Sequence, residues 1–294
     1  MVASFSNGDP PLPMRLTNPQ VGLYSATWLP QRSGDAVVTA TAASPALGTA
    51  RTAIIGSVLD SREAPVLYPV AVLSILRPES PAPLAPGTPV QVYGEHFTDA
   101  PATAGQVPLP QALGGASLLI GAREAPLFYA SPGQLNAQVP PDLPPDAQYS
   151  TVILSGDRYT VADPVVVVST RPALVTTAGA VVAWHSDLSL VSAAAPVRDG
   201  EEITLLAGGL GATEPSVTAG SMPSPEVTAQ VRTPIQLHIG GRMATVGSAA
   251  LAPDLIGFYR VVFTLPDGLP VGSHPVFIEQ DGVRSNDAVI SVRP

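Results

Sequence analysis

The chain has 294 residues and a net charge of −9, with 45% hydrophobic and 13% charged residues. This acidic balance disfavours nucleic acid as a partner, because a negative surface repels phosphate backbones. Cysteine is absent, which excludes disulfides, thiolate metal sites and cysteine nucleophiles. The 34 prolines and 26 glycines separate short β-branched runs and interrupt every long helical pattern, so the sequence predicts an all-β protein.

Neither a signal peptide nor a membrane span is expected in the chain. Residues 1–7 have no basic start and no apolar core. The most apolar run, at 65–76, contains two prolines and is shorter than the ~20 residues that a spanning helix needs. We therefore expect no membrane insertion.

Residues 1–62 form the first predicted unit. The segment 23–28 alternates like a half-buried strand, and after turn residues the segment 36–42 is expected to return as its hairpin partner. Ile54 and Ile55 indicate one further strand. Because an immunoglobulin-like sandwich has about seven strands, we expect a partial sandwich. Open strand edges invite pairing, so we expect completion by a neighbouring chain or by upstream sequence, and assembly into fibres.

Closely spaced prolines at 63–83 predict a stiff, extended linker. Two further units follow, at 84–171 and 172–294, each with short strands separated by turn residues. In the first the expected strands are 90–93, 116–120, 125–129, 135–139, 151–155 and 164–168. In the second they are 180–184, 202–206, 235–239, 257–265, 274–280 and 288–292. This pattern predicts tandem immunoglobulin-like β-sandwich domains.

These two units are copies of one domain. Residues 86–97 align with 199–210, residues 118–125 with 237–244, and residues 134–140 with 260–266, in the same order. Three ordered matches at nearly constant spacing are the signature of an internal repeat. The repeat organisation is therefore predicted from the sequence before any fold is known.

The string Ala-Pro-Leu-Phe-Tyr-Ala-Ser-Pro-Gly-Gln-Leu-Asn at 125–136, with 84–87, 92–94, 113–115 and 208–211, resembles a known bacterial family. This is the Solibacter-type carboxy-terminal domain of large secreted acidobacterial proteins, which is functionally uncharacterised. The resemblance covers about residues 75–294. Residues 5–11 and 24–28 are similar to the bacterial Ig-like module that often precedes that domain, and the repeats are similar to IPT-type folds. The resemblance implies secreted or cell-surface placement and transfers no catalytic residue.

The four histidines, His96, His185, His238 and His274, do not have the spacing of paired metal ligands. His238 is expected to point to solvent from its strand. Glu95 beside His96 is a weak metal candidate, because the second copy has glycines at both positions.

No nucleophile motif accompanies the remaining polar residues. His185, Ser186 and Asp187 are adjacent in sequence, but a triad requires convergence in space. The carboxylate pairs Glu201 with Glu202 and Asp142 with Asp146 are expected to be solvated turn residues rather than an acid and a base.

The sequence also contains candidate residues for calcium, phosphate and sugar sites. Asn7 with Asp9, and Asp281 with Asn286 and Asp287, are the best calcium candidates, although turn formation explains them better. The glycines at 208–211 lack the lysine of a phosphate loop and are expected to allow positive φ and a bulge at the end of a strand. Trp28 and Trp184 suit core positions or a sugar platform. Tyr93, Phe128, Tyr129, Phe258 and Tyr259 are expected mainly in packing.

The sequence thus favours a non-enzymatic extracellular structural or adhesive module, with no catalytic, cofactor or metal site. Self-association or other cell-surface proteins are the expected partners. The alternative is a carbohydrate-binding accessory module of a larger secreted protein, with a glycan as partner and Trp184 or Tyr129 as its aromatic contacts. A hydrolase is the weakest of the three hypotheses.

Overall fold

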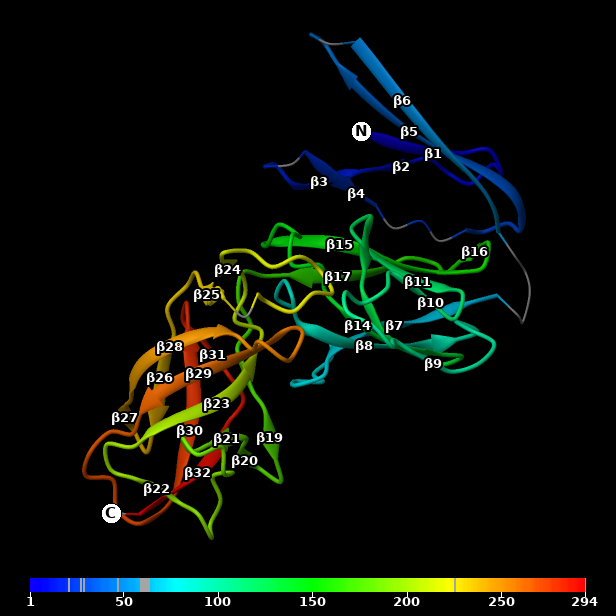
Figure 1. The fold of residues 1–294 in the computed structure, drawn as a ribbon. Coiled ribbons are helices and arrows are strands. Elements are labelled where there is room, and N and C mark those ends of the chain that lie inside the picture. The colour runs from blue at the N-terminus through cyan, green and yellow to red at the C-terminus, as the bar shows by residue number, and fades with distance from the viewer. Residues whose placement is uncertain are drawn as a thin grey trace.

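The computed structural model describes all residues of the chain except 21, 27, 29, 47, 59–63, 225 and 294. Across the described residues the regular secondary structure consists of strands, mostly in antiparallel sheets. Figure 1 shows three parts in succession: an N-terminal unit, a middle sandwich and a C-terminal sandwich, with the two chain ends far apart. The fold is all-β with tandem immunoglobulin-like sandwiches, as the sequence predicts.

The N-terminal unit has one four-stranded sheet, in the order β2-β1-β5-β6, and a separate hairpin, β3-β4. The strands are β1 (Val2–Phe5), β2 (Leu12–Pro13), β3 (Arg15–Asn18), β4 (Leu23–Ser25), β5 (Gly34–Ser44) and β6 (Gly48–Val58).

The predicted hairpin between 23–28 and 36–42 is wrong. β4 pairs with β3, whereas β5 pairs with β1 and, along eleven residues, with β6. β5 pairs with β6 and not with the segment 23–28, because residues 48–58 are rich in Thr, Ala and Ile and form an antiparallel partner along the full length of β5. Residue 27 of the predicted strand and the predicted end of this unit at 59–62 lie outside the described residues.

The linker predicted at 63–83 is also corrected. Its first part, β7 (Val66–Ser74), is a strand that pairs with β8 (Pro89–Glu95) at the edge of the middle sandwich. Pro69 does not prevent this pairing, because the ladder is interrupted between Leu67 and Val72 and tolerates a missing donor there. Residue 63 lies outside the described residues.

The middle sandwich packs a sheet in the order β7-β8-β14-β13-β9 on a sheet built around β10-β11-β15-β16, to which β12 and β17 also pair. Its further strands are β9 (Ala102–Thr103), β10 (Ala112–Leu113), β11 (Ala116–Ile120), β12 (Arg123–Ala125), β13 (Leu127–Ser131), β14 (Gln134–Gln138), β15 (Ala147–Ser155), β16 (Arg158–Tyr159) and β17 (Asp163–Val167).

The C-terminal sandwich packs a sheet in the order β18-β23-β29-β28-β25-β24, with β21 on β23, against a sheet in the order β19-β20-β32-β30-β26-β27, with β22 and β31 attached. Its strands are β18 (Ala173–Leu174), β19 (Thr176–Thr177), β20 (Ala180–Val181), β21 (Ala183–Trp184), β22 (Val197–Arg198), β23 (Glu202–Gly208), β24 (Thr213–Glu214), β25 (Gln230–Val231), β26 (Gln236–Ile239), β27 (Arg242–Met243), β28 (Thr245–Leu251), β29 (Phe258–Thr264), β30 (Gly272–Gln280), β31 (Val283–Arg284) and β32 (Ala288–Arg293). The strand β28 was not predicted from the sequence.

The two sandwiches share one topology. β8 pairs with β14, and β14 with β13, just as β23 pairs with β29, and β29 with β28. The register also matches, because Gln91 opposes Asn136 and the aligned Thr204 opposes Val262. The other sheets correspond as β11-β15-β17 and β26-β30-β32. The repeats found in the sequence are therefore structural repeats.

Each sandwich has its own hydrophobic core, built mainly by alternation of buried and outward residues along its strands. In the middle sandwich Val90, Val92 and Leu135 are fully buried, and in the C-terminal sandwich Ile203, Leu205 and Val261 are equally buried. Successive side chains point to opposite faces of a sheet, so the intervening residues face outward. Because the inward positions are filled by packing, residues able to contact a ligand or partner lie on these outer faces, between the sandwiches, or in the N-terminal unit.

Candidate functional site

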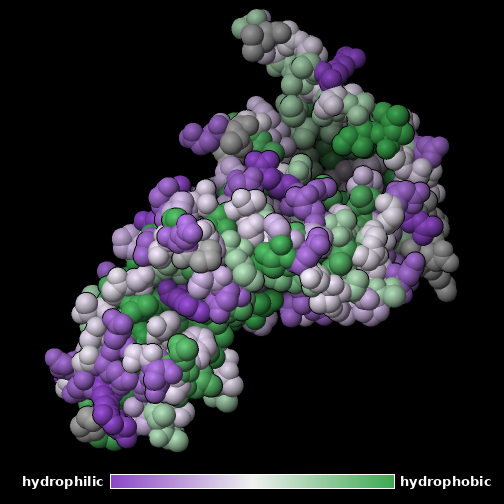
Figure 2. Space-filling model, viewed as in Figure 1, coloured by the Kyte–Doolittle hydropathy of each residue, from purple (hydrophilic) through white to green (hydrophobic). Residues whose placement is uncertain are grey.

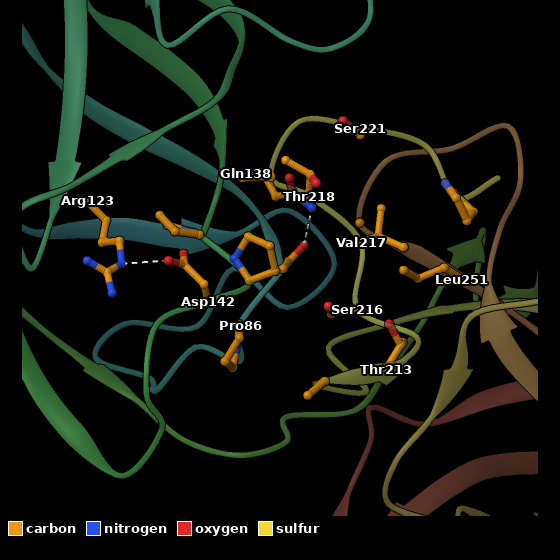
Figure 3. A pocket seen from close by; sticks show the side chains of 18 of the residues that line it. Pro86, Arg123, Gln138, Asp142, Thr213, Ser216, Val217, Thr218, Ser221 and Leu251 are labelled. Atoms are coloured by element: carbon orange, nitrogen blue, oxygen red, sulfur yellow. Dashed lines mark hydrogen bonds and ion pairs between the residues drawn. The ribbon is translucent and has the colours of Figure 1, made fainter. Parts of the chain in front are cut away.

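The most obvious hollow is a cleft of about 830 Å³ between the two sandwiches. Figure 3 shows its two walls, with Arg123, Gln138 and Asp142 on the middle sandwich and Thr213 and Thr218 on the C-terminal sandwich. The lining mixes polar side chains with proline, glycine and small apolar residues. A cleft between domains is a usual place for a ligand, so its polar groups decide what it can do.

Several polar groups of this cleft are paired within the chain. The Gln138 side chain accepts a hydrogen bond from the Gly220 backbone nitrogen at 2.8 Å and donates to the Gly87 carbonyl at 3.3 Å. The Leu109 nitrogen donates to the Gly220 carbonyl at 2.8 Å. Arg123 forms an ion pair with Asp142 at 2.7 Å. The Gln138–Gly220 and Leu109–Gly220 hydrogen bonds join the two sandwiches, so the cleft lies along the joint between them.

The glycines at 208–211 complete that joint. A Cβ on Gly209 would lie 2.0 Å from the Arg171 carbonyl oxygen, and one on Gly211 would lie 2.3 Å from the Ser169 carbonyl oxygen. Both glycines have positive φ, 69° and 78°. The expected positive φ is confirmed at Gly209 and Gly211, whereas β23 pairs with β29 in an unbroken register up to Gly208, without the expected bulge. The two glycines allow close backbone approach of the connecting segment.

An ion-pair network spans the same joint. Glu79 accepts from Arg77 at 3.0 Å and from Arg171 at 2.7 Å, and Arg77 also donates to the Pro172 and Arg284 carbonyl oxygens. The hydrogen bond from Arg77, together with the charges of both guanidinium groups, holds the pKa of Glu79 below its ordinary value. Arg77 and Glu79, which precede β8, are thus bonded to the connecting segment through Arg171 and Pro172. Arg77 is also bonded to the C-terminal sandwich at Arg284.

His185 is the most engaged histidine. Its Nδ1 lies 2.5 Å from Glu201 Oε1 and its Nε2 lies 3.1 Å from the Ala195 carbonyl oxygen. Burial opposes the charged imidazole, but the Glu201 hydrogen bond, the Ala195 carbonyl and nearby carboxylates outweigh it and raise the pKa of His185. Adjacent Asp187 instead binds the Ser189 backbone and hydroxyl. The structure therefore joins His185 to Glu201 and not to its sequence neighbours.

The other three histidines lie apart from one another. His96 has positive φ and is 3.8 Å from the Glu95 carboxylate, whose other oxygen accepts from Tyr68 at 2.5 Å. His274 Nε2 lies 2.6 Å from the Pro270 carbonyl oxygen.

His238 was expected to point to solvent, and this is wrong. It is half-buried and stacks on Phe277 at 4.6 Å, while Arg284 covers the Phe277 ring at 3.7 Å. The long neighbouring aromatic side chain on β30 explains the difference, because directly opposed residues on paired strands contact each other.

The calcium candidates have other roles. Asp9, which is 6% exposed, accepts from Trp28 Nε1 at 2.9 Å, from the Gln31 backbone at 3.1 Å and from Asn7 at 3.1 Å. Burial opposes the ionised carboxylate, but these three hydrogen bonds and Arg32 lower the pKa of Asp9. Trp28 also stacks on Phe5 with ring centroids 4.3 Å apart. This cluster organises the N-terminal unit.

At the other end of the chain Asn286 binds the backbone nitrogen and carbonyl of Leu174, and Asp287 pairs with Arg284. The carboxylates Asp142 and Asp146 are separately engaged with Arg123 and Ser169. Over the described part of the chain, no group of three or more His, Asp or Glu residues is arranged to hold a metal ion.

A different surface emerges on the outer face of the sheet β7-β8-β14-β13-β9. It carries Gln91, Tyr93, Tyr129, Gln134 and Asn136, all half-buried, which we call the tyrosine–amide face. Tyr93 and Tyr129 were expected in packing, and this is wrong for both, because the buried residues Val92 and Ala130 beside them take the inward positions. The alternation in 90–93 and 134–137 is the sequence signal for the outward positions of β8 and β14, but it does not show which strands lie side by side.

Trp184 lies on the corresponding outer face of the C-terminal sandwich, where it opposes Thr204 on β23 and bridges to Leu190. It is half-buried there. Tyr259 is buried and donates to the Gly211 carbonyl oxygen, which confirms packing for that residue.

No protein-family model and no curated protein sequence matches this chain. Solved structures resemble it weakly. A Bacteroides ovatus mixed-linkage glucan utilization protein, SGBP-B in complex with a mixed-linkage heptasaccharide, is 13% identical, with a TM-score of 0.34 over 92% of this chain and 59% of that one. Domains 4–9 of the surface layer protein SbsC are 13% identical, with a TM-score of 0.24 over 99% of this chain and 38% of that one. The titin Ig tandem A164–A165 is 8% identical, with a TM-score of 0.22 over 72% of this chain and 89% of that one.

The chain therefore spans little more than half of the first of these structures and well under half of the second. In the described residues there is no helix long and apolar enough to cross a membrane.

Proposed function

We propose that this chain is a non-enzymatic, extracellular structural or adhesive module that pairs with a second copy of itself through strand β6. The observation that carries the proposal is the open edge and exposed apolar surface of β6. Secreted or cell-surface placement is part of the proposal. The locked joint supports it, because two sandwiches fixed to each other make a stiff spacer.

The described residues of the N-terminal unit form no hydrophobic core of their own. Its buried apolar residues in the described part of the chain are Ala3 and Ala36, whereas each sandwich buries a large cluster. Small alanine side chains bury little area, so this unit gains little hydrophobic stabilisation by itself. Another surface would have to supply the missing packing.

An apolar row crosses the sheet and ends at its open edge. Phe5 opposes Val38, and Val38 opposes Ile54, which is 70% exposed. Ile55, on the other face of β6, is 79% exposed. Figure 2 shows apolar surface gathered over the middle of β6. A strand added beside β6 would continue the row and cover this surface.

The two edges of the sheet differ in their capacity to pair. β2, at one edge, has two residues and ends in Pro13, with Pro10 and Pro11 just before it. Proline has no backbone donor, so this edge is protected. β6, at the other edge, is eleven residues long, contains no proline and has Arg51 as its single charged residue. Long edges of this kind, with few charges and no proline, recruit further strands.

We commit to a second copy of this chain as the occupant. When β6 pairs with β6 of another copy, the contact is self-complementary and closes a two-fold dimer. An antiparallel register centred near Ala53 brings Arg51 opposite Ile55 and avoids a like-charge contact. Longer fibres would require a further contact elsewhere, with the dimer as their building unit.

The test is sedimentation velocity of the full chain over a wide concentration range. We expect a reversible monomer–dimer equilibrium that the double variant Ile54→Lys/Ile55→Lys abolishes, because edge lysines oppose strand pairing. The control is Leu188→Lys/Val271→Lys, which places the same charges on residues that are 82% and 69% exposed in the C-terminal sandwich. A wild-type monomer at every concentration, or equal effects of both double variants, would refute the proposal.

A carbohydrate-binding accessory module is the second candidate function, and one observation favours it. Tyr129 lies on an outer sheet face beside amide side chains, whereas Trp184 opposes Thr204 and bridges to Leu190. Aromatic rings next to amide groups suit sugars, which present both apolar faces and hydroxyl groups. The two candidate functions use different surfaces and do not exclude each other.

A further inference from the structure

The tyrosine–amide face brings together residues from three neighbouring strands of one sheet. Tyr129 on β13 opposes Asn136 on β14, and Asn136 opposes Gln91 on β8. One row is therefore Tyr129, Asn136, Gln91. In the next row Tyr93 opposes Gln134. Strands lie about 4.8 Å apart, and residues two positions apart on a strand lie about 6.8 Å apart, so Tyr93 and Tyr129 are separated by about 12 Å diagonally across the sheet.

Hydrogen bonds within this face fix the side chains before any ligand arrives. The Tyr93 hydroxyl donates to Gln91 Oε1 at 2.7 Å, and Gln134 Nε2 donates to Asn136 Oδ1 at 2.6 Å. The Gln91 and Asn136 oxygens are thereby engaged, which orients their amide nitrogens as donors for a ligand. A face ordered in advance loses less side-chain entropy when it binds.

The tyrosine–amide face carries no charged residue. At its border the Glu95 carboxylate accepts a hydrogen bond from Tyr68, and this bond, with desolvation, raises the pKa of the Tyr68 hydroxyl. In a chain with a net charge of −9, an uncharged face bordered by a carboxylate favours neutral ligands over anionic ones.

The second copy provides an internal comparison, because it keeps the same strands and register but not these side chains. Thr204, Leu206, Arg260 and Val262 stand at the positions of Gln91, Tyr93, Gln134 and Asn136. The β-sandwich alone therefore does not account for the tyrosines and amides of the first copy.

We infer that the tyrosine–amide face binds a neutral oligosaccharide, with the Tyr93 and Tyr129 rings contacting sugar faces and the amides of Gln91, Gln134 and Asn136 binding hydroxyl groups. The spacing of the two tyrosines fits a chain of several sugars rather than a single one. This inference rests on the second candidate function, and it is independent of β6 pairing.

The experiment is isothermal titration calorimetry of the full chain with cellohexaose, xylohexaose and mannohexaose, and with an acidic hexagalacturonate for comparison. We expect at least one neutral hexasaccharide to bind. Tyr93→Ala and Tyr129→Ala should each weaken that binding by about tenfold or more, since each removes an aromatic contact. Tyr159→Ala, at a tyrosine that is 59% exposed on β16, is the matched control and should leave binding unchanged.

Two further variants separate the outcomes. Tyr93→Phe keeps the ring and should retain most of the affinity, which guards against an Ala variant that fails to fold. Trp184→Ala tests the other aromatic candidate. Neutral binding that is lost with Trp184→Ala and kept with Tyr93→Ala and Tyr129→Ala would overturn this site while leaving a carbohydrate-binding function. Binding of hexagalacturonate alone would overturn the neutral class, and absence of binding to all four sugars would overturn the site and the second candidate function together.

Discussion

The two sandwiches have the same strand topology and register but different side chains on their outer faces. Inward positions keep their apolar character between copies, as with Val92 and its counterpart Leu205, both fully buried. Outward positions differ, as with Asn136 and its counterpart Val262, although each opposes the aligned residue of the neighbouring strand. The comparison teaches that packing fixes the inner faces of a duplicated domain, while its outer faces are free to acquire separate roles.

The division of roles is visible in the contacts. In the C-terminal sandwich, Gly209 and Gly211 allow the backbone at 169–171 to approach closely. The same sandwich contains the His185–Glu201 ion pair. At the position of Glu201 the middle sandwich has Thr88, whose buried hydroxyl makes no hydrogen bond to described residues. The middle sandwich instead carries the tyrosine–amide face.

The largest expected effect is loss of a core aromatic residue from one copy. Phe263 is 1% exposed in the core of the C-terminal sandwich, so Phe263→Ala should lower the free energy of unfolding of that sandwich by about 3–5 kcal/mol. Trp184 fluorescence reports this sandwich in urea titrations once Trp28→Phe removes the other tryptophan, since the chain has two. A loss below about 1 kcal/mol would mean that the buried ring does not support the core.

The joint comes next. Gly209→Ala forces a Cβ against the Arg171 carbonyl at a positive φ, whereas Gly241→Ala has a similar φ and nothing within 4 Å. We expect Gly241→Ala to cost about 1 kcal/mol from backbone strain alone, and Gly209→Ala to cost more. Small-angle X-ray scattering should show a changed inter-sandwich arrangement for Gly209→Ala. Identical scattering and stability for both variants would argue against a close-packed joint.

A smaller effect should depend on pH in the C-terminal sandwich. The pKa of His185 is raised above 6.5, so its contribution is complete below pH 6.5 and is lost as the pH rises through the raised value. Burial opposes ionisation of Glu201, but the His185 and Arg198 hydrogen bonds lower the pKa of Glu201 below 4.5, so its contribution is present above pH 4.5 and is lost as the pH falls through the lowered value. The pair should therefore stabilise most between pH 4.5 and 6.5.

The variant Glu201→Gln measures the contribution of the His185–Glu201 ion pair to the free energy of unfolding. We expect it to lower the free energy of unfolding by on the order of 1 kcal/mol near pH 5.5 and by less at pH 8.5, as followed by Trp184 fluorescence in urea in the Trp28→Phe background. An equal loss at both pH values would show that the side chain acts through packing and not through charge.

The smallest expected effect concerns the N-terminal edge. Ile54→Lys/Ile55→Lys should change the unfolding free energies of both sandwiches by less than about 0.5 kcal/mol, because both side chains are largely exposed and lie outside the two cores. Thermal unfolding by circular dichroism of dilute protein checks this. A large destabilisation would place these isoleucines in a packed interface within one chain.

Much of the fold follows from the sequence because alternation and repeat spacing are local signals. The strand at 116–120 and its aligned partner were predicted from apolar runs with turn glycines, and both form with matching pairings. β7 and the partner choice of β5 were missed, because each depends on pairing with a distant segment that local pattern does not reveal.

The candidate surfaces were harder to predict for a related reason. The alternation around Tyr93 and around Asn136 was readable in each strand, but only the register between β8, β14 and β13 shows that these side chains share one face. His185 and Glu201 are likewise sixteen residues apart and meet through the fold.

Cysteine cross-linking tests the central claim, β6 pairing between two copies, most directly, because the chain has no cysteine and each introduced one is unique. Single cysteines at successive positions along β6, oxidised at a concentration where the dimer forms, should cross-link best near Ala53, and less well toward both ends, since a disulfide needs Cα atoms within about 7 Å. Ser117→Cys, on β11, is the control and should remain monomeric. Uniformly weak cross-linking along β6, no stronger than that of the control, would contradict the account.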